Sequence, residues 1–311
     1  MNLLYYRFKP FLPRGLRIAL RRWVMRRKLP GCSGLWPIDE AAGRPPADWA
    51  GWPDGKKFGF VITHDVEGPA GVDRSLPLAE MDAAAGFRSS FNFIPEGEYR
   101  VAPELRQALA RRGFEVGVHD LRHDGHLYRS RGDFADHARR INEYLKEWGS
   151  RGFRSGFMLH NLEWLADLDV AYDSSTFDTD PFEPQPDGVG TIFPFWVPRA
   201  DGTEYLELPY TLPQDSTLFI YLQETSIAIW QRKLDWLVER GGLALVNVHP
   251  DYMAFAGAAP HPFQFPAVWY QQFLQYVNDR YGGQFWHGTA RELAEVLAAR
   301  RRARPPTAPH P

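Results

Sequence analysis

The chain has 311 residues, of which 44% are hydrophobic and 24% are charged, and its formal net charge is −2 at pH 7. This length and composition suit one large folded domain or two smaller ones and exclude a globally disordered chain. The single cysteine, Cys32, excludes an internal disulfide and a metal site built from several cysteines, which fits a reducing compartment.

The first 30 residues form a basic segment. They contain nine Lys and Arg residues and no Asp or Glu, so the rest of the chain is net acidic. Leu16, Leu20, Trp23 and Val24 fall on one face of a predicted helix. Such a basic amphipathic helix either binds an anionic membrane surface or packs on the acidic body of its own protein, and both alternatives stay open. No stretch is apolar enough to span a bilayer, and no secretory signal is expected.

Strands and helices alternate along the rest of the chain, after a linker rich in Gly, Pro and Ala at residues 30–53. This alternation predicts an α/β fold with a parallel sheet flanked by helices, either open or closed into a barrel. The expected strands cover residues 58–62, 89–94, 115–118, 153–154, 170–172, 192–197, 205–208, 243–248 and 284–286. The expected helices cover residues 78–85, 103–112, 133–148, 227–240, 267–281 and 289–301.

Two acidic residues follow the first predicted strand. The apolar run at residues 58–62 leads into Thr63-His64-Asp65-Val66-Glu67. Because strand side chains alternate between two faces, Asp65 and Glu67 point the same way, while Val66 points back into the packing. Two carboxylates on one face need a cation, a proton or hydrogen-bond donors. A polar strand end that only caps the next turn would give the same pattern.

Other polar residues also occur where predicted strands end. His119 follows the third strand, Arg154 ends the fourth, and His249 follows the strand at residues 243–248. In (β/α) barrels the carboxyl ends of the strands meet on one face, where the chemistry takes place. A single histidine at a strand end is commonly structural, but several polar residues at several strand ends predict a functional site.

His119 and His123 are spaced four residues apart directly after a predicted strand. If the chain coils there, the two imidazoles meet on one face about one helical turn apart. With one carboxylate, two imidazoles form the three-ligand set of a catalytic zinc site, which keeps a position open for water. His126 fits this spacing less well, and we expect it to be exposed or behind the ligands.

These stretches resemble the motifs of the polysaccharide deacetylases of the NodB-homology type, over roughly residues 57–291. Thr63-His64-Asp65-Val66-Glu67 is similar to the first motif of that family, typically Thr-Phe-Asp-Asp, and looks like its Asp-Val-Asp/Glu variant. His119-Asp120-Leu121-Arg122-His123 is similar to the second motif, His-(Ser/Thr)-x-x-His, which supplies two metal ligands.

Three further motifs follow in the order that the family has them. Phe153-Arg154-Ser155-Gly156 resembles the third motif, Arg-x-Pro, although Gly156 replaces the proline and would loosen the wall behind Arg154. Leu245-Val246-Asn247-Val248-His249-Pro250 is similar to the last motif. The fourth motif is expected near three acidic residues among which the sequence does not choose: Asp173, Asp178 and Asp180.

The resemblance implies a distorted (β/α) barrel of about seven strands at residues 54–301. A basic helical extension and linker at residues 1–53 would precede it, and a flexible tail at residues 302–311 would follow. The implied activity is metal-dependent removal of N-acetyl groups from an amino sugar in a glycan or a glycan precursor, with release of acetate.

The resemblance also implies a role for each candidate site residue. Glu67, His119 and His123 would hold one divalent metal ion, with zinc expected and cobalt, nickel, manganese or iron as alternatives. Asp65, kept anionic by the cation and Arg154, would be the general base. The remaining catalytic residue, His249, would be the general acid that protonates the leaving amine.

Two other functions stay open: a metal-dependent amidohydrolase for another small C–N bond substrate, and a catalytically dead glycan-binding barrel. Nucleic-acid binding is not expected, because the chain has no Walker-type or GxGxxG pattern and its body is acidic. The lack of a secretory signal predicts a cytoplasmic protein that acts on a lipid-linked or nucleotide-linked sugar, with residues 1–30 in peripheral contact with the anionic inner membrane face.

Overall fold

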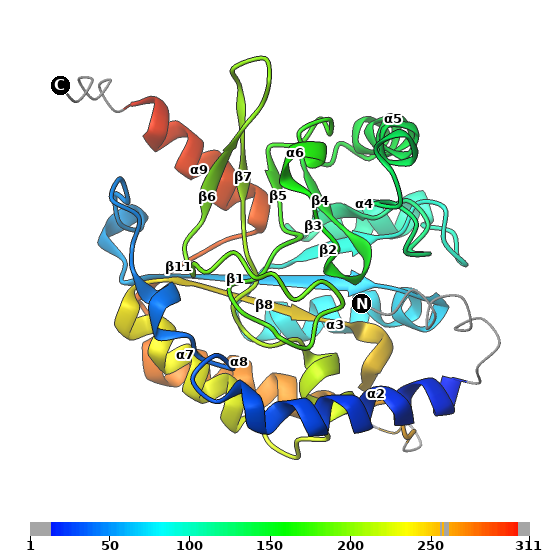
Figure 1. Cartoon of the computed structure of the whole chain (residues 1–311), viewed down its shortest axis with the longest axis vertical. Helices are drawn as coiled ribbons and strands as arrows, with labels where there is room; N and C mark the ends of the chain where they lie inside the picture. Colours follow the sequence, from blue (N-terminus) through cyan, green and yellow to red (C-terminus); the bar gives the residue numbers. More distant parts are fainter. Residues whose placement is uncertain (1–13, 256, 258–260, 304–311) are drawn as a thin grey trace.

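The computed structural model describes the chain except residues 1–13, 256, 258–260 and 304–311, so part of the basic segment and nearly all of the expected tail lie outside the described residues. One curved sheet runs through its centre, with helices on both faces (Figure 1). Its strands in chain order are β1 (Phe58–Val66), β2 (Ser90–Phe93), β3 (Glu115–His119), β4 (Gly152–Arg154), β5 (Tyr172–Asp173), β6 (Phe195–Pro198), β7 (Glu204–Glu207), β8 (Leu243–Val248) and β11 (Phe285–His287).

The sheet is mixed but mostly parallel. Its strands are ordered β11, β1, β2, β3, β4, β5, β7, β6. Strand β8 lies outside this order and pairs with β1. Among the described strands of this sheet only β6 and β7 pair in antiparallel orientation. The curled half-barrel confirms the expected distorted (β/α) barrel. It contains nine strands rather than about seven, because short strands of three and four residues, β11 and β6, extend it at the ends.

Most helices lie close to their expected positions, but α3 (Pro69–Ala84) begins earlier than expected and the short helix α6 (Leu162–Leu165) was not expected. Two short strands, β9 (Met253–Ala254) and β10 (Phe265–Pro266), form a separate pair. The helices are α2 (Arg14–Lys28), α3 (Pro69–Ala84), α4 (Pro103–Arg111), α5 (Arg131–Trp148), α6 (Leu162–Leu165), α7 (Ala228–Arg240), α8 (Ala267–Tyr281) and α9 (Ala290–Arg302).

Helix α3 begins nine residues earlier than expected, because Pro69 and Gly71 do not break the chain there. Proline is favourable in the first turn of a helix, where its missing N–H is not needed. The Asp251 carboxylate, from a distant loop, accepts a hydrogen bond from the Gly71 N–H at 3.1 Å and so caps the helix. In the helix, Asp82 lies 2.8 Å from Nε2 of His64, which is completely buried and therefore structural.

Strand β1 is buried along its whole length, and its side chains alternate between two layers. Phe60 packs in a cluster with Trp230 of α7, and α7 and α8 lie together on one side of β1 and β8 (Figure 1). Val61 belongs to a second cluster that joins β1, β5, β7 and β8 across the interior of the curved sheet and includes Leu293 of α9. Asp65 lies four residues after Val61 and shares its face, so the expected alternation is confirmed.

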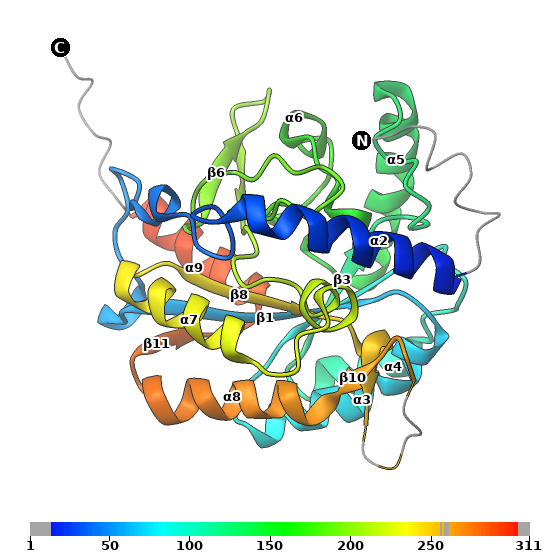
Figure 2. The same ribbon diagram turned by 60° about the horizontal axis from the view of Figure 1, so that its bottom comes forward.

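Helix α2 lies along the outside of the molecule (Figure 2). Ile18 and Met25 are buried against the body, where the helix contacts the π-helix η6 (Ser216–Leu222). The predicted apolar stripe of Leu16, Leu20, Trp23 and Val24 points away from the body and is exposed. The helix therefore packs on the body of its own protein, as one of the two alternatives expected, but through Ile18 and Met25 rather than through the apolar stripe. Among the described helices, none combines the length and the apolar character needed to cross a membrane.

Candidate active site and metal centre

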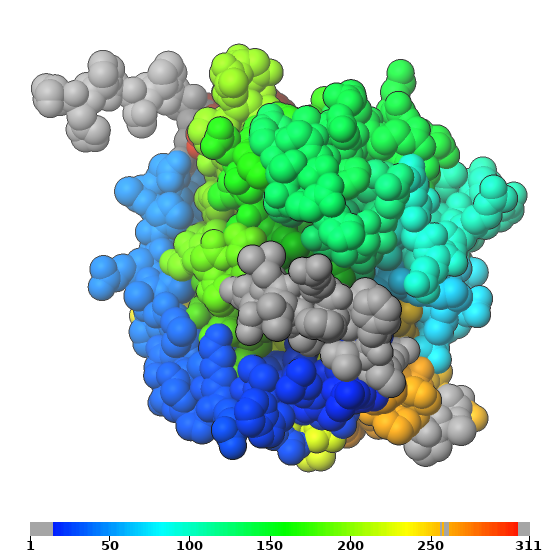
Figure 3. Space-filling view, turned by 45° about the vertical axis from the view of Figure 1, so that its right-hand side comes forward, coloured from blue at the N-terminus to red at the C-terminus, as the bar shows by residue number. Residues whose placement is uncertain are grey.

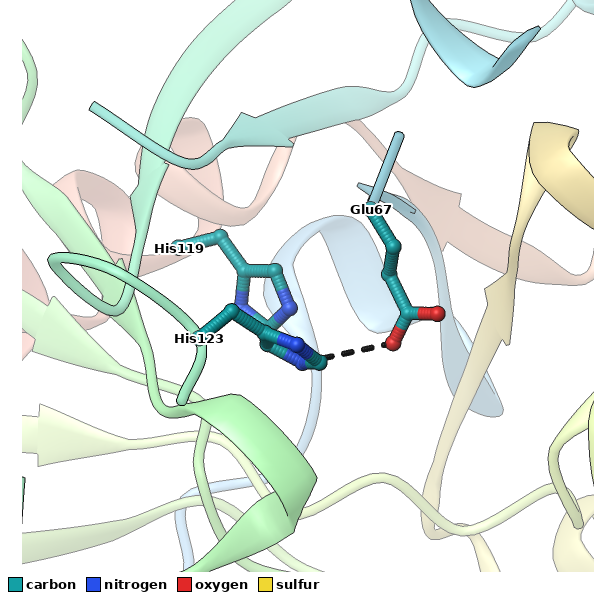
Figure 4. Close-up of side chains that lie close together, drawn as sticks. All are labelled: Glu67, His119 and His123. Atoms are coloured by element: carbon teal, nitrogen blue, oxygen red, sulfur yellow. Dashed lines mark ion pairs between the residues drawn. The ribbon is translucent and has the colours of Figure 1, made fainter. Parts of the chain in front are cut away.

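Glu67, His119 and His123 converge beyond the carboxyl ends of β1 and β3 (Figure 4). One potential ligand atom from each residue lies within 4.8 Å of the other two. Nε2 of His123 is 3.3 Å from Oε1 of Glu67, and the centroids of the two imidazole rings are 4.9 Å apart. The structure thus brings together the carboxylate and the two imidazoles that the sequence singled out.

The two histidines meet through a turn rather than through a helix. Strand β3 ends at His119, and Asp120 and His123 then have positive φ angles of 55° and 54°. Phe157 and Met158, beside this turn in the fold, also have positive φ, so four of the six described non-glycine residues in this conformation lie at this place. Such angles are rare outside glycine and cluster at functional sites, where the surrounding structure enforces them.

The two imidazoles suit a metal ion. Nδ1 of His119 lies 3.0 Å from the Arg154 carbonyl oxygen, which accepts a hydrogen bond from the Nδ1–H and leaves the Nε2 lone pair for a ligand. Within the described part of the chain, neither Nε2 of His119 nor Nε2 of His123 has a hydrogen-bond partner. Burial lowers the pKa of His123 despite the nearby Glu67, which favours the neutral ring that binds a cation.

The carboxylate of Glu67 completes this set. Burial would raise its pKa, but His123, His249 and His119 lower it below the ordinary value, so Glu67 is anionic at neutral pH. Oε2 accepts a hydrogen bond from the Tyr252 hydroxyl at 2.8 Å, and Oε1 points toward His123. One anionic oxygen and two imidazole nitrogens are the donors that zinc and similar cations prefer. The residues present therefore fit a divalent metal ion.

Two amides fix the carboxylate of Asp65, which lines the same cavity as this cluster. Its Oδ1 accepts a hydrogen bond from Nδ2 of Asn92 at 2.9 Å, and its Oδ2 accepts one from Nδ2 of Asn247 at 2.8 Å. Burial would raise the pKa of Asp65, but Arg154, the neighbouring histidines His119 and His249, and the Asn92 amide lower it well below the ordinary value. Asp65 is therefore a fixed, anionic carboxylate inside the barrel.

Arg154 lies beside Asp65, as the third motif predicted, but acts on it through charge rather than through a close hydrogen bond. Its Nε is 3.9 Å from Oδ1 of Asp65. Its Nη2 donates to the Thr63 hydroxyl at 2.9 Å, and that hydroxyl donates to Oδ1 of Asn247 at the same distance. The side chain is fully buried. Arg154 therefore also fixes the amide that orients Asp65.

His249 is oriented by a residue that the sequence analysis missed. Its Nδ1 lies 2.6 Å from Oδ1 of Asp215, and its backbone N–H donates to Oδ2 of the same carboxylate at 2.8 Å. Burial would lower the pKa of His249, but Asp215 and then Glu67 raise it to about 10. Asp215 lies seven residues beyond the end of the strand predicted at residues 205–208, so the strand-end pattern gave no signal for it.

The three acids considered for the fourth motif lie elsewhere. Asp178 forms a buried ion pair with Lys233 at 2.5 Å. Asp180 accepts a hydrogen bond from the Tyr210 hydroxyl at 3.0 Å, and Asp173 accepts one from the backbone N–H of Ser175 at 2.9 Å. None of the three is among the residues that line the cavity at Asp65. Their contacts are structural.

A cavity of about 100 Å³ connects these groups. It offers far less space than a pocket that encloses a drug-sized ligand, so only a small group of a larger substrate fits inside. A larger depression of about 750 Å³ lies near the amino ends of β2 and β3, away from the histidines. The small cavity is lined by His119 and His123 and by the following residues: Arg21, Asp65, Glu67, Ser155, Phe157, Met158, Glu183, Pro184, Gln214, Ser216, Tyr221, His249 and Tyr252.

Gly156 is required by the packing of this site. A Cβ atom on Gly156 would lie 2.4 Å from Oδ2 of Asp120 and 2.8 Å from Cδ2 of His123. Both distances are too short for real contacts, so any side chain here would displace the side chains of Asp120 and His123.

His126 lies three residues after His123. It is exposed and pairs with Asp124 at 3.3 Å, as expected from its spacing.

No family model and no curated protein sequence matches the chain. Among solved structures, a polysaccharide deacetylase from Mycobacterium smegmatis is 20% identical with a TM-score of 0.62, over 86% of this chain and 99% of that one. Peptidoglycan deacetylase PdaC from Bacillus subtilis is 15% identical with a TM-score of 0.45, over 80% and 95% of the two chains. A family 4 carbohydrate esterase from Streptomyces lividans is 14% identical with a TM-score of 0.44, over 75% and 93%. The first of these likenesses shows that the chain has the distorted (β/α) barrel fold of the Mycobacterium smegmatis structure.

Proposed function

We propose that this protein is a metal-dependent hydrolase that removes the N-acetyl group from an amino sugar in a glycan or a glycan precursor and releases acetate. One observation carries the proposal: a single small cavity brings a metal-ligand set together with an anionic carboxylate and a histidine of raised pKa. The likeness in fold to a polysaccharide deacetylase supports it.

The cluster of Glu67, His119 and His123 would hold the cation through Oε1 and the two Nε2 atoms. A divalent cation held there supplies Lewis acidity, which polarises an amide carbonyl and makes water more acidic. The His119–Arg154 and Glu67–Tyr252 hydrogen bonds keep these ligand atoms pointing inward. Zinc is the metal we propose, with cobalt, nickel, manganese and iron as alternatives for the same donors.

Asp65 would accept the proton of the attacking water. Its oxygens each receive one amide hydrogen bond, from Asn92 and Asn247, which leaves further lone pairs for a water proton. Because Arg154 and the neighbouring imidazoles keep this carboxylate ionised, it is in the form that a general base needs.

His249 would donate the proton that the leaving nitrogen requires. Its Nδ1–H is bound by Asp215, so Nε2 is the atom that faces the cavity, 4.0 Å from Oε1 of Glu67. A pKa of about 10 keeps the ring protonated at neutral pH. An amine leaves as a neutral molecule only after protonation, so an acid at this position completes the reaction.

Acetate release tests the proposal directly. The purified, metal-loaded protein is incubated with chitin oligosaccharides, a nucleotide-linked N-acetylhexosamine and a lipid-linked N-acetylhexosamine, and acetate is measured. Release from at least one of them, absent in the Asp65→Asn variant, is the expected result. A fully metal-loaded protein that binds such sugars without releasing acetate would instead identify a dead glycan-binding barrel.

Replacing Asp215 by asparagine is expected to move the alkaline limb of the pH–rate profile to lower pH. The general acid works only while protonated, so activity falls as the pH rises through the pKa of His249. Loss of the Asp215 charge lowers that pKa, by about 1–2 units. His249→Ala is expected to lower kcat by about 10²–10⁴-fold with the metal retained. Asp187→Asn, on an exposed carboxylate, is the control; an alkaline limb that stays in place in Asp215→Asn would show that another group protonates the amine.

Replacing Gly156 by alanine is expected to weaken metal binding by about 10–100-fold, because the added methyl group displaces His123. Competition with a chromophoric chelator measures the zinc affinity. Gly31→Ala is the matched control, since a Cβ atom there would meet nothing within 4 Å. Equal zinc affinity in both variants would show that Gly156 does not support the site.

A further inference from the structure

The outward face of α2 is the largest grouping of exposed apolar side chains in the described part of the chain. Leu16, Leu20, Trp23 and Val24 are 54%, 41%, 52% and 47% exposed. Scattered apolar residues on a surface need no explanation, but four on one face within nine residues indicate an interaction surface. Figure 3 shows this helix, in dark blue, at the surface of the molecule.

The helix is fixed to the body without using this face. Ile18 and Met25 are buried on the opposite side. Nε of Arg22 donates to the Ile220 carbonyl at 2.8 Å, and Nη1 of Arg21 donates to the Tyr221 hydroxyl at 3.3 Å. The apolar stripe is therefore available to a second partner while α2 stays docked.

The charge around the stripe indicates the chemistry of that partner. Helix α2 contains seven Lys and Arg residues and no acidic residue. Arg26, Arg27 and Lys28 are exposed in its last turn, and the Arg27 guanidinium lies 4.2 Å from the centre of the Trp23 ring. A partner must therefore be anionic and must also take up leucine, valine and tryptophan side chains.

We propose that α2 docks on an anionic membrane surface through Leu16, Leu20, Trp23 and Val24. The apolar side chains enter the boundary between headgroups and acyl chains, and the basic residues bind the lipid headgroups. A nucleic acid would neutralise the charge but leave the apolar stripe in water. A second copy of the chain would cover the stripe but bring its own exposed Arg26, Arg27 and Lys28 close to those of the first.

Docking of this kind has a consequence for the substrate, and this consequence rests on the proposed deacetylase function. Arg21 belongs to α2 and also lines the catalytic cavity. A membrane on the outer face of α2 is therefore one helix diameter, about 10–12 Å, from the cavity rim. A membrane-anchored sugar can reach the cavity from there.

Sedimentation with vesicles tests the docking. The full-length Asp65→Asn variant is mixed with phosphatidylcholine vesicles that contain phosphatidylglycerol, or with phosphatidylcholine alone. Binding is expected only to the anionic vesicles, and it should weaken as salt is added. A double variant with Leu20→Glu and Trp23→Glu should lose at least about tenfold in affinity. Replacing Arg26 and Arg27 by alanine should lower the affinity for anionic vesicles about fivefold for each residue.

Val268→Glu is the matched control, because Val268 is 48% exposed but lies on α8. Circular dichroism and the Tm report that each variant is folded. Equal binding of the double variant and the control, or no binding at low salt, would overturn the proposal. Binding to DNA instead of vesicles, or a dimer that Leu20→Glu disrupts without vesicle binding, would overturn it as well. The assay measures no catalysis, so its failure leaves the deacetylase proposal untouched.

Discussion

Replacing Asp65 by asparagine is expected to lower kcat by about 10²–10⁴-fold while the protein keeps its divalent metal. The carboxylate is not in the metal-ligand cluster, and two amide donors already fix its oxygens. Asparagine cannot accept a proton from water, so the base is lost while the three ligand side chains stay in place. Metal content by elemental analysis and acetate release on the same sample check both halves of this prediction.

The asparagine also carries a cost in stability that the experiment must separate from catalysis. Its amide group turns an N–H toward Asn92 or Asn247, which leaves one buried donor without an acceptor and costs about 1–3 kcal/mol. We therefore expect a lower Tm but a folded, metal-loaded protein. If Asp65→Asn empties the site and excess metal restores activity, then Asp65 is the ligand and Glu67 is the base.

Replacing either of the two histidines that we propose as ligands is expected to remove most of the metal. Wild-type protein should carry about one divalent ion per chain, as the single three-residue ligand group in the described part of the chain implies. His119→Ala and His123→Ala each leave only two ligands, and their activity should fall with the metal content. Chelation of the wild-type protein should abolish acetate release, and added zinc should restore it.

His126→Ala is the matched control for the ligand variants. His126 belongs to the same turn region as His123, but its side chain is 60% exposed and contacts Asp124 rather than Glu67. This variant should keep both its metal and its activity. Full metal occupancy in a protein that lacks both His119 and His123 would rule out the proposed metal centre.

The residues at the strand ends could be predicted from the sequence because their signal is local. Alternation along β1 is enough to place Asp65 and Glu67 on one side. The parallel order of β1, β3 and β8 then brings His119 and His249 to the same end of the sheet. A chain that alternates strands and helices thus indicates both its fold class and the position of its chemistry.

The residues that orient Asp65 could not be predicted, because they depend on strand register. Asn92 lies directly beside Asp65 in the β1–β2 pairing, and Asn247 lies beside Thr63 in the β1–β8 pairing. A shift of one residue in either register would turn these amides to the other face. Gly117 depends on register in the same way, since a Cβ atom there would lie 2.1 Å from Oδ1 of Asn92.

Asp215 was missed for a different reason. It precedes the π-helix η6, a rare element whose backbone pattern has no sequence signal comparable to strand alternation. Its carboxylate accepts hydrogen bonds from the Ser216 N–H at 2.7 Å and from His249. One side chain therefore starts η6 and orients the proposed general acid, a double role that only the tertiary structure reveals.

The π-helix η6 connects the proposed general acid to the helix that we propose docks on a membrane. At its start Asp215 binds His249, and near its other end Ile220 and Tyr221 accept hydrogen bonds from α2. A substrate that moved η6 would also move the groups that hold α2, and thermodynamic linkage would make this influence reciprocal. Occupancy of the cavity would then alter the affinity for lipid by the same factor by which lipid alters the affinity for the sugar, so the enzyme would be recruited to membranes that carry its substrate.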